Sequence, residues 1–243
     1  MLKRALFVMM AIALLVSACG GGETDTATTV GADGVELFGG ASLTSVTGTR
    51  AMTLGDTRVN VTMEDEWKVA LSEAFDPFGS AFYVLQPITA SGDNPALQFL
   101  RPSDLVEVAD LGHDLQTRPE GGTIDLSSAF DLESWLSMLP ADVEVAPREP
   151  VQFAGLDSVM FDIEMSESVC ESACSFLIVE REDSRSGRFS LAGLATGRTY
   201  SVIWTDRGAD AFPIVTLISG DDAFFEAALD VVGSAAIGEP PAE

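Results

Sequence analysis

An apolar run from Ala5 to Val16 constrains the fold most, because it decides which residues belong to the folded protein. Two positive charges, Lys3 and Arg4, precede this run. The run is shorter than the roughly 20 apolar residues that a helix needs to cross a bilayer. A charged start, a short apolar middle and small residues at the end are typical of a secretory signal peptide. We therefore predict that residues 1–18 are a signal peptide that is removed on export.

The predicted cleavage site resembles the bacterial lipobox, with the sequence Leu15-Val16-Ser17-Ala18-Cys19. In a lipobox the cysteine thiol receives a diacylglycerol and becomes the mature N-terminus. An ordinary signal peptide followed by a chance cysteine is the alternative, but charge, run length, small residues and cysteine all agree with the lipobox. Each buried methylene contributes about 0.8 kcal/mol, so two or three acyl chains anchor a protein stably. We predict lipidation of Cys19 and an extracytoplasmic location, lipid-anchored to the cell membrane.

The residues after Cys19 have the composition of a flexible tether. Three glycines begin a stretch rich in Thr, Ala and Gly that reaches about Gly40. Such a composition does not bury enough apolar surface to become ordered. We assign residues 19–50 to the lipidated cysteine and linker, residues 51–238 to one globular domain, and residues 239–243 to a disordered tail. A domain of that size has room for a substantial core.

The chain is strongly acidic, with 38 Asp and Glu against 13 Lys and Arg and a formal net charge of -25. Nucleic acid binding needs a basic patch that displaces counterions from phosphates, so the charge excludes that class of function. Direct adhesion to an anionic lipid surface is disfavoured for the same reason. Solubility is the simplest explanation of the acidity. Calcium or a cationic partner is the alternative, but the sequence has no D-x-[DN]-x-[DN]-G loop.

Two of the three cysteines remain once Cys19 is assigned to lipid. An even pair in an oxidising compartment predicts a disulfide between Cys170 and Cys174. Their C-x-x-x-C spacing differs from the C-x-x-C of redox motifs. A zinc site would need two further ligands, and His113 is the single histidine of the chain. We predict no cofactor and no metal.

Hydrophobic periodicity predicts many strands and few helices. A helix over residues 131–139, capped by Asp131, has apolar residues at helical spacing, and a last helix follows Asp222 and reaches about Ala236. The residues Glu64 to Glu66 are expected to form a turn between two strands. Strands are predicted at 58–63, 67–71, 81–85, 97–100, 143–145, 151–153, 158–165, 176–180, 199–204 and 212–218. The expected fold class is α+β, with a largely antiparallel β-sheet and helices packed on it.

This order of elements resembles the PsbP-like α-β-α sandwich, which actinobacterial lipoproteins of the LpqN kind also use. The resemblance rests on a strand pair with a turn before Trp67, a D-L-x-x-W-L helix at 131–136, and an F-x-G-L-x-S turn at 153–158. A cysteine pair before a strand, and a C-terminal hairpin and helix, complete it. The resemblance implies a non-enzymatic envelope or thylakoid-lumen protein that binds partners or ligands. It brings no catalytic residue to this chain.

Motifs that would name a reaction are absent from the sequence or incomplete in it. There is no G-x-S-x-G nucleophile elbow. The segment Gly193–Thr199 lacks the lysine of a phosphate-binding loop and is interpreted as a turn. His113 and Asp114 could form a dyad for a serine nucleophile, because imidazole titrates near neutrality. A surface-loop histidine is favoured, since neighbouring residues seldom have the mutual geometry that a dyad needs.

Aromatic and acidic side chains offer a weaker hint of ligand binding. Paired carboxylates hydrolyse glycosides, but so many acidic residues make some close pair inevitable. Trp67, Trp135 and Trp204 could line a sugar or lipid site, yet each falls where an element faces inward, so core packing is favoured. The sequence therefore gives no catalytic, cofactor-binding or metal-ligating residue.

We accordingly expect a lipid-anchored, non-catalytic domain that binds a protein partner or an apolar cell-envelope ligand. One alternative is an envelope hydrolase that acts on glycan or lipid, which a deep cleft with two perturbed carboxylates would favour. The other is a structural or assembly factor of the cell envelope, which an exposed apolar patch would favour.

Overall fold

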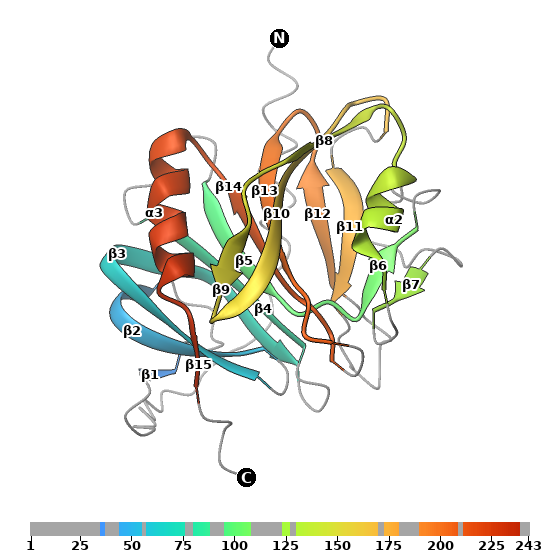
Figure 1. Ribbon diagram of the computed structural model, residues 1–243. Helices are drawn as coiled ribbons and strands as arrows, with labels where there is room; N and C mark the ends of the chain where they lie inside the picture. Colours follow the sequence, from blue (N-terminus) through green and yellow to red (C-terminus); the bar gives the residue numbers. More distant parts are fainter. Residues whose placement is uncertain are drawn as a thin grey trace, which may run out of the picture.

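Two antiparallel sheets and two helices make up the described part of the chain in a computed structural model (Figure 1). The structure describes residues 35–36, 44–54, 57–75, 80–87, 95–107, 123–126, 130–169, 173–179, 190–208 and 211–238.

The larger sheet holds 11 strands among the described residues, and its main path runs β1-β2-β3-β4-β5-β14-β13-β10-β8. Neighbours on this path are antiparallel except β1 and β2, which are parallel. Off the path, β9 pairs with β10 and β15 with β3. The bounds are Val35–Glu36 (β1), Thr44–Leu54 (β2), Thr57–Phe75 (β3), Ser80–Pro87 (β4), Ala96–Leu100 (β5), Ile214–Ser219 (β14), Thr199–Thr205 (β13), Leu156–Met165 (β10), Val143–Pro147 (β8), Val151–Phe153 (β9) and Ala236–Ile237 (β15).

The larger sheet curls around the helix α3 (Asp222–Gly233). Met52 on β2 and Met160 on β10 belong to one core cluster with the buried side of α3, although their strands lie six positions apart in the sheet. Strands are about 4.8 Å apart, so a flat sheet would separate these two strands by about 29 Å. A helix with its side chains is only about 10–12 Å across. The sheet must therefore bend into a half-barrel with α3 on its concave face.

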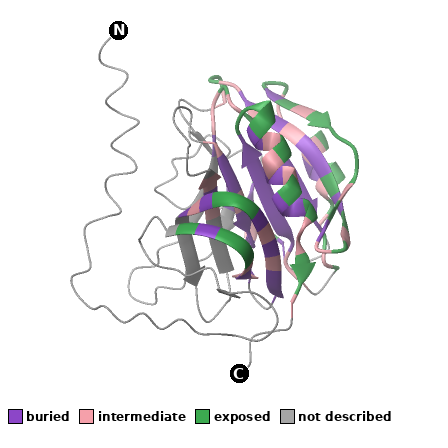
Figure 2. Ribbon diagram, turned by 90° about the vertical axis from the view of Figure 1, so that its left-hand side faces the viewer, coloured by how far each residue is buried: buried purple, intermediate pink, exposed green. Residues whose placement is uncertain are grey.

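The smaller sheet packs on the opposite face of the larger one. Its order is β12-β11-β6-β7, with bounds Ser190–Ala195 (β12), Ala173–Val179 (β11), Asp104–Val106 (β6) and Thr123–Asp125 (β7). Phe176 and Leu177 of β11 share a core cluster with Phe161 of β10 and Val202 of β13. The short helix α2 (Leu132–Ser137) adds Trp135, whose ring meets Phe176 edge-on at 5.4 Å between centroids. Buried residues follow the strands of the larger sheet, while α3 alternates between buried and exposed (Figure 2).

The expected α+β class, and with it the PsbP-like sandwich, is wrong. The structure is mostly antiparallel β, a curled half-barrel sheet, and its helices do not form layers of a sandwich. The expectation failed because local periodicity predicts which residues form strands but not how far the sheet extends. Once so many strands share one sheet, their accumulated right-handed twist bends it on itself.

The acidic residues Glu64, Asp65 and Glu66 are not a turn. They lie within β3, which runs unbroken from Thr57 to Phe75. Across from them on β2, Val46 pairs with Trp67 and Gly48 with Met63, so β3 carries extra residues in a bulge. All three acidic side chains are exposed there, and Gly48 supplies the backbone angle φ of 72° opposite them.

The ordered chain also starts earlier than predicted. The strand β2 begins at Thr44, inside the segment 19–50 that was expected to be linker, and β1 lies there as well. The edge of the folded part is therefore at or before residue 44 and not at residue 51.

Several local predictions are confirmed. The side chain of Asp131 caps α2 by accepting from Ser134 N at 3.1 Å, and α3 ends at Gly233, three residues before the predicted end. The predicted hairpin is β13 and β14, and Gly208 N donates to Asp206 Oδ1 at 2.8 Å in its loop. Trp67, Trp135 and Trp204 are buried, as the core interpretation required.

The strand β8 forms one edge of the larger sheet and pairs, among described strands, with β10 alone. Arg148 N donates to Met160 O at 3.0 Å, and Ser166 N donates to Asp142 O at 3.2 Å, just beyond the two ends of the strand. Val143 N points away from β10 and donates to Pro140 O at 2.9 Å. The strand ends at Pro147.

Candidate functional site

The concave face of the larger sheet carries the larger of two clusters of buried apolar side chains in the described residues. Buried apolar side chains of β2, β3, β4, β5, β14, β13, β10 and β9 lie on it. We call this set the apolar concave face: Val46, Met52, Leu54, Val59, Val61, Met63, Trp67, Val69, Leu85, Leu97, Phe99, Phe153, Met160, Ile203, Ile214 and Ile218. Their burial depends on α3, which lies against them.

The helix α3 forms where it does because of a cap and an apolar stripe. Asp221 Oδ1 accepts from Phe224 N at 2.9 Å, which satisfies one of the free N–H groups at the helix start. Phe224, Ala228, Val231 and Val232 recur at helical spacing and are buried against the sheet. The ring of Phe224 lies 5.6 Å from that of Trp67, between centroids. Aromatic contacts of this kind fix the helix on the apolar concave face.

The C-terminal end of α3 is tied to β3 by hydrogen bonds. Ser234 Oγ accepts from Thr62 N at 2.7 Å and lies 2.6 Å from Val231 O, to which it donates. Beyond it, β15 pairs with Asn60 and Val59, and Gly238 N donates to Arg58 O at 2.9 Å. This end of the helix is therefore held through backbone groups of β3.

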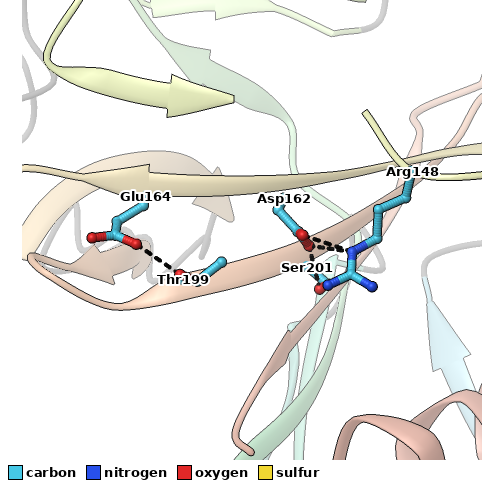
Figure 3. Close-up of polar contacts among 5 residues, drawn as sticks. All are labelled: Arg148, Asp162, Glu164, Thr199 and Ser201. Atoms are coloured by element: carbon cyan, nitrogen blue, oxygen red, sulfur yellow. Dashed lines mark hydrogen bonds and ion pairs between the residues drawn. The ribbon is translucent and has the colours of Figure 1, made fainter. Parts of the chain in front are cut away.

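Polar side chains lie on the same face of the sheet, at the end formed by β10 and β13. We call them the polar row and define it as Arg148, Asp162, Glu164, Thr199 and Ser201 (Figure 3). Asp162 on β10 is opposite Ser201 on β13, and Glu164 is opposite Thr199. Ser201 Oγ donates to Asp162 Oδ1 at 2.6 Å, and Thr199 Oγ1 donates to Glu164 Oε2 at 2.7 Å. Each acidic residue is thus oriented by a hydroxyl from the neighbouring strand.

Arg148 joins the polar row to α3. Its Nε lies 2.7 Å from both Oδ1 and Oδ2 of Asp162 and donates to them. Its guanidinium carbon lies 4.4 Å from the ring centroid of Phe225 on α3. The side chains of Arg148 and Asp162 are 38% and 19% exposed, so the pair is open to solvent and salt.

One hydroxyl in the middle of the apolar concave face has no partner. Thr216 on β14 is 0% exposed, and its Oγ1 makes no hydrogen bond. Its neighbours across the sheet are Ile203 and Phe99, which offer no acceptor from their side chains. An unsatisfied buried hydroxyl costs about 1–3 kcal/mol, so this group is one that a bound molecule could satisfy.

Some sequence-predicted sites fall outside the described residues. Cys19, Cys170, His113 and Asp114 all do, so lipidation, the disulfide and the dyad stay predictions. The backbone of Cys174 lies in β11, opposite Leu194 of β12.

The turn predicted within Gly193–Thr199 is confined to residues 196–198, because residues 193–195 belong to β12 and Thr199 begins β13. In this turn between β12 and β13, Gly197 has a φ of 66° and its N donates to Met165 O at 2.9 Å.

The polar row was not predicted from the sequence. The signal was present in β10, where Met160, Asp162 and Glu164 alternate with apolar residues and so share one face. Recognising the row also needs the register of β10 with β8 and β13, which single-strand patterns do not contain.

Within the described ranges, no group of three His, Cys, Asp or Glu side chains is placed to hold a metal ion. The helices in the described part of the chain are too short or too polar to cross a membrane. Searches against protein-family models, curated proteins and solved structures find no match to this chain.

Proposed function

We propose that this protein is a bacterial lipoprotein, anchored outside the cytoplasm through lipid on Cys19, whose β domain is a non-catalytic binding module for an apolar cell-envelope ligand. One observation carries the proposal: the apolar concave face gathers side chains from strands across a curled sheet and is covered by the single helix α3. Ligand sites are concave, mostly apolar and furnished with few polar groups.

The composition of the apolar concave face supports a ligand of variable shape. Met52, Met63 and Met160 all lie on it. Methionine side chains are unbranched and polarisable, so they repack around different apolar partners at low cost. A ligand would replace the contacts that α3 makes with this face, and Thr216 Oγ1 would supply a hydrogen bond within it.

The polar row supports a non-catalytic role. Ser201 is 5% exposed and donates to Asp162, whose two oxygens also accept from Arg148. A serine nucleophile needs a base that removes its proton and room for a substrate. The carboxylate here is already engaged by a guanidinium, so this arrangement orients side chains and does not activate the hydroxyl.

Native mass spectrometry of the full chain, purified from its host in mild detergent, tests the binding function. We expect an additional mass that organic solvent extracts as an apolar compound. Bare protein, together with no crosslinked partner in intact cells, would contradict both the ligand version and the protein-partner version.

The anchor is tested separately by Cys19→Ala, with membrane fractionation and mass analysis of the N-terminus. We expect the variant to be released from the membrane fraction, because the acyl chains provide the attachment. A variant that stays on the membrane, or a wild-type N-terminus without acyl chains, would refute the anchor.

A further inference from the structure

A β-bulge at the edge of the larger sheet directs Arg148 onto the polar row. The pairing of β8 with β10 ends at Pro147, and the pairing of β9 with β10 begins at Val151. Residues 148–150 therefore lie opposite residues 159–160 alone, so the edge carries one residue more than β10 does. Such an extra residue bends the strand and redirects the side chains at the bulge.

The guanidinium group of Arg148 is held in place without the use of its terminal nitrogens. Its Nε donates to both carboxylate oxygens of Asp162 at 2.7 Å, and Ser201 Oγ donates to that carboxylate at 2.6 Å. The ring centroid of Phe225 lies 4.4 Å from Cζ of Arg148. Among the described residues, Nη1 and Nη2 make no hydrogen bond, and the side chain of Arg148 is 38% exposed. Both nitrogens point away from the carboxylate and form an oriented fork that is open to solvent (Figure 3).

Two carboxylates lie further along the same face of the sheet. Glu164 follows Asp162 by two residues on β10, so the two side chains share a face and are about 7 Å apart along the strand. Glu144 on β8 pairs directly with Glu164, and like charges in that position destabilise a sheet. Within the described part of the chain, Glu164 accepts from Thr199 through Oε2 alone. Its Oε1 is therefore left to accept from a bound molecule.

The fork and the acidic pair attract groups of opposite charge. A planar carboxylate fits the parallel N–H groups of a guanidinium and accepts from two of them at once. An ammonium group near Glu164 and Glu144 relieves the repulsion between them. A simple anion meets that repulsion, and a simple cation leaves the fork unused. A molecule with both charges satisfies both ends.

We propose that this corner of the sheet binds a zwitterion, whose carboxylate is held by the Arg148 fork and whose ammonium group is held by Glu164 and Glu144. The site lies on the solvent side of the polar row and does not involve the apolar concave face. The proposal therefore goes beyond the proposed function and stands without it.

NMR titration of the ¹⁵N-labelled full chain in an uncharged mild detergent tests the proposal. The probes are 4-aminobutyrate, butyrate and butylamine, which have chains of equal length. The Nε–H signal of Arg148 reports on the fork, and that of Arg198, in the turn between β12 and β13, is the internal reference. An exposed charge pair changes affinity by about 2- to 5-fold, so 4-aminobutyrate should bind more tightly than either other probe by about that factor. Equal or tighter binding of butyrate or butylamine, or an Arg148 signal that does not shift, would overturn the proposal.

The variant Glu164→Gln distinguishes a binding role from a structural one, because its effects on two probes differ in sign. It removes a partner of the ammonium group, so the affinity for 4-aminobutyrate should fall by about 2- to 5-fold. It also removes repulsion, so butyrate should bind at least as tightly as before. Glu133→Gln is the matched control, because Glu133 is exposed on α2, on the opposite face of the larger sheet, and its loss changes the net charge equally. Weaker binding of both probes, or equal effects of the two variants, would contradict the site.

The variant Arg148→Lys tests the fork itself. It keeps the positive charge but replaces the planar group with a single ammonium, so butyrate and 4-aminobutyrate should both bind about 2- to 5-fold more weakly, as followed by the amide signals of β10. Arg198→Lys, the control, should leave both affinities unchanged. Unchanged binding of butyrate to Arg148→Lys would mean that charge alone attracts the carboxylate and would refute the role given to the fork.

Discussion

Replacing Ser234 by alanine should weaken the attachment of α3 to β3. The hydroxyl accepts from Thr62 N at 2.7 Å and donates to Val231 O at 2.6 Å, so one oxygen joins the helix end to the strand. Alanine leaves Thr62 N without this acceptor at a part-buried position. A buried donor that loses its partner costs about 1–3 kcal/mol, and partial burial reduces this to the lower part of that range. We expect Ser234→Ala to lower the free energy of unfolding by about 1.5 kcal/mol.

Urea unfolding followed by tryptophan fluorescence measures this loss, and thermal unfolding should show a Tm lower by about 3–6 °C. Ser137→Ala is the matched control, because Ser137 Oγ also donates to a helix carbonyl, Ser134 O, at 2.7 Å but is exposed. Water replaces the lost hydrogen bond there, so the change should stay within about 0.5 kcal/mol. Equal losses in the two variants, or a loss below about 0.5 kcal/mol for Ser234→Ala, would refute the role given to the Thr62 amide.

Further substitutions test other local features. Ala154 and Gly155 form the two-residue turn between β9 and β10, with φ of 53° and 79°. Because asparagine tolerates a positive φ better than alanine does, Ala154→Asn should raise the free energy of unfolding by about 0.5–1 kcal/mol in urea titrations. In the same assay, Gly155→Ala should lower it by about 1–2 kcal/mol. Removing the cap with Asp221→Ala should cost about 1 kcal/mol by the same assay, and a loss near zero would contradict the cap at 2.9 Å. The predicted disulfide between Cys170 and Cys174 should give a 2 Da mass difference on reduction, and about 2 kcal/mol of stability should disappear with it; two free thiols in the exported protein would contradict it.

Elements with local signals could be predicted from the sequence. Both helices carry an aspartate cap and an apolar stripe, and both signals lie in the helix itself or in the residue that precedes it. The hairpin of β13 and β14 has a Gly-containing turn between two apolar runs. These features are set by residues close together in the chain, so reading the sequence finds them.

Features set by distant residues could not be predicted. The strand β3 looks interrupted at Glu64–Glu66 because a polar run resembles a turn, and only its pairing with β2 and β4 shows that the strand continues. The segment of β2 is rich in Thr and Ser, so its composition matches a tether. The polar row requires Asp162 and Ser201, 39 residues apart, to face each other, which depends on register.

The backbone of β8 has a consequence for whether neighbouring molecules can join through this edge of the sheet. The backbone hydrogen bonds of Arg148 and Ser166 at the ends of the strand show that the N–H and C=O groups of its even-numbered residues point to β10. The N–H and C=O groups of its odd-numbered residues therefore point away from β10. The N–H of Val143 donates to Pro140 O, and Pro147 has no N–H. Val145 is therefore the one residue of β8 whose N–H is left as a donor on the side away from β10. A second sheet cannot extend this edge with a regular ladder. Copies crowded side by side on a membrane, as we propose, would therefore not join into one continuous sheet through a regular ladder at this edge.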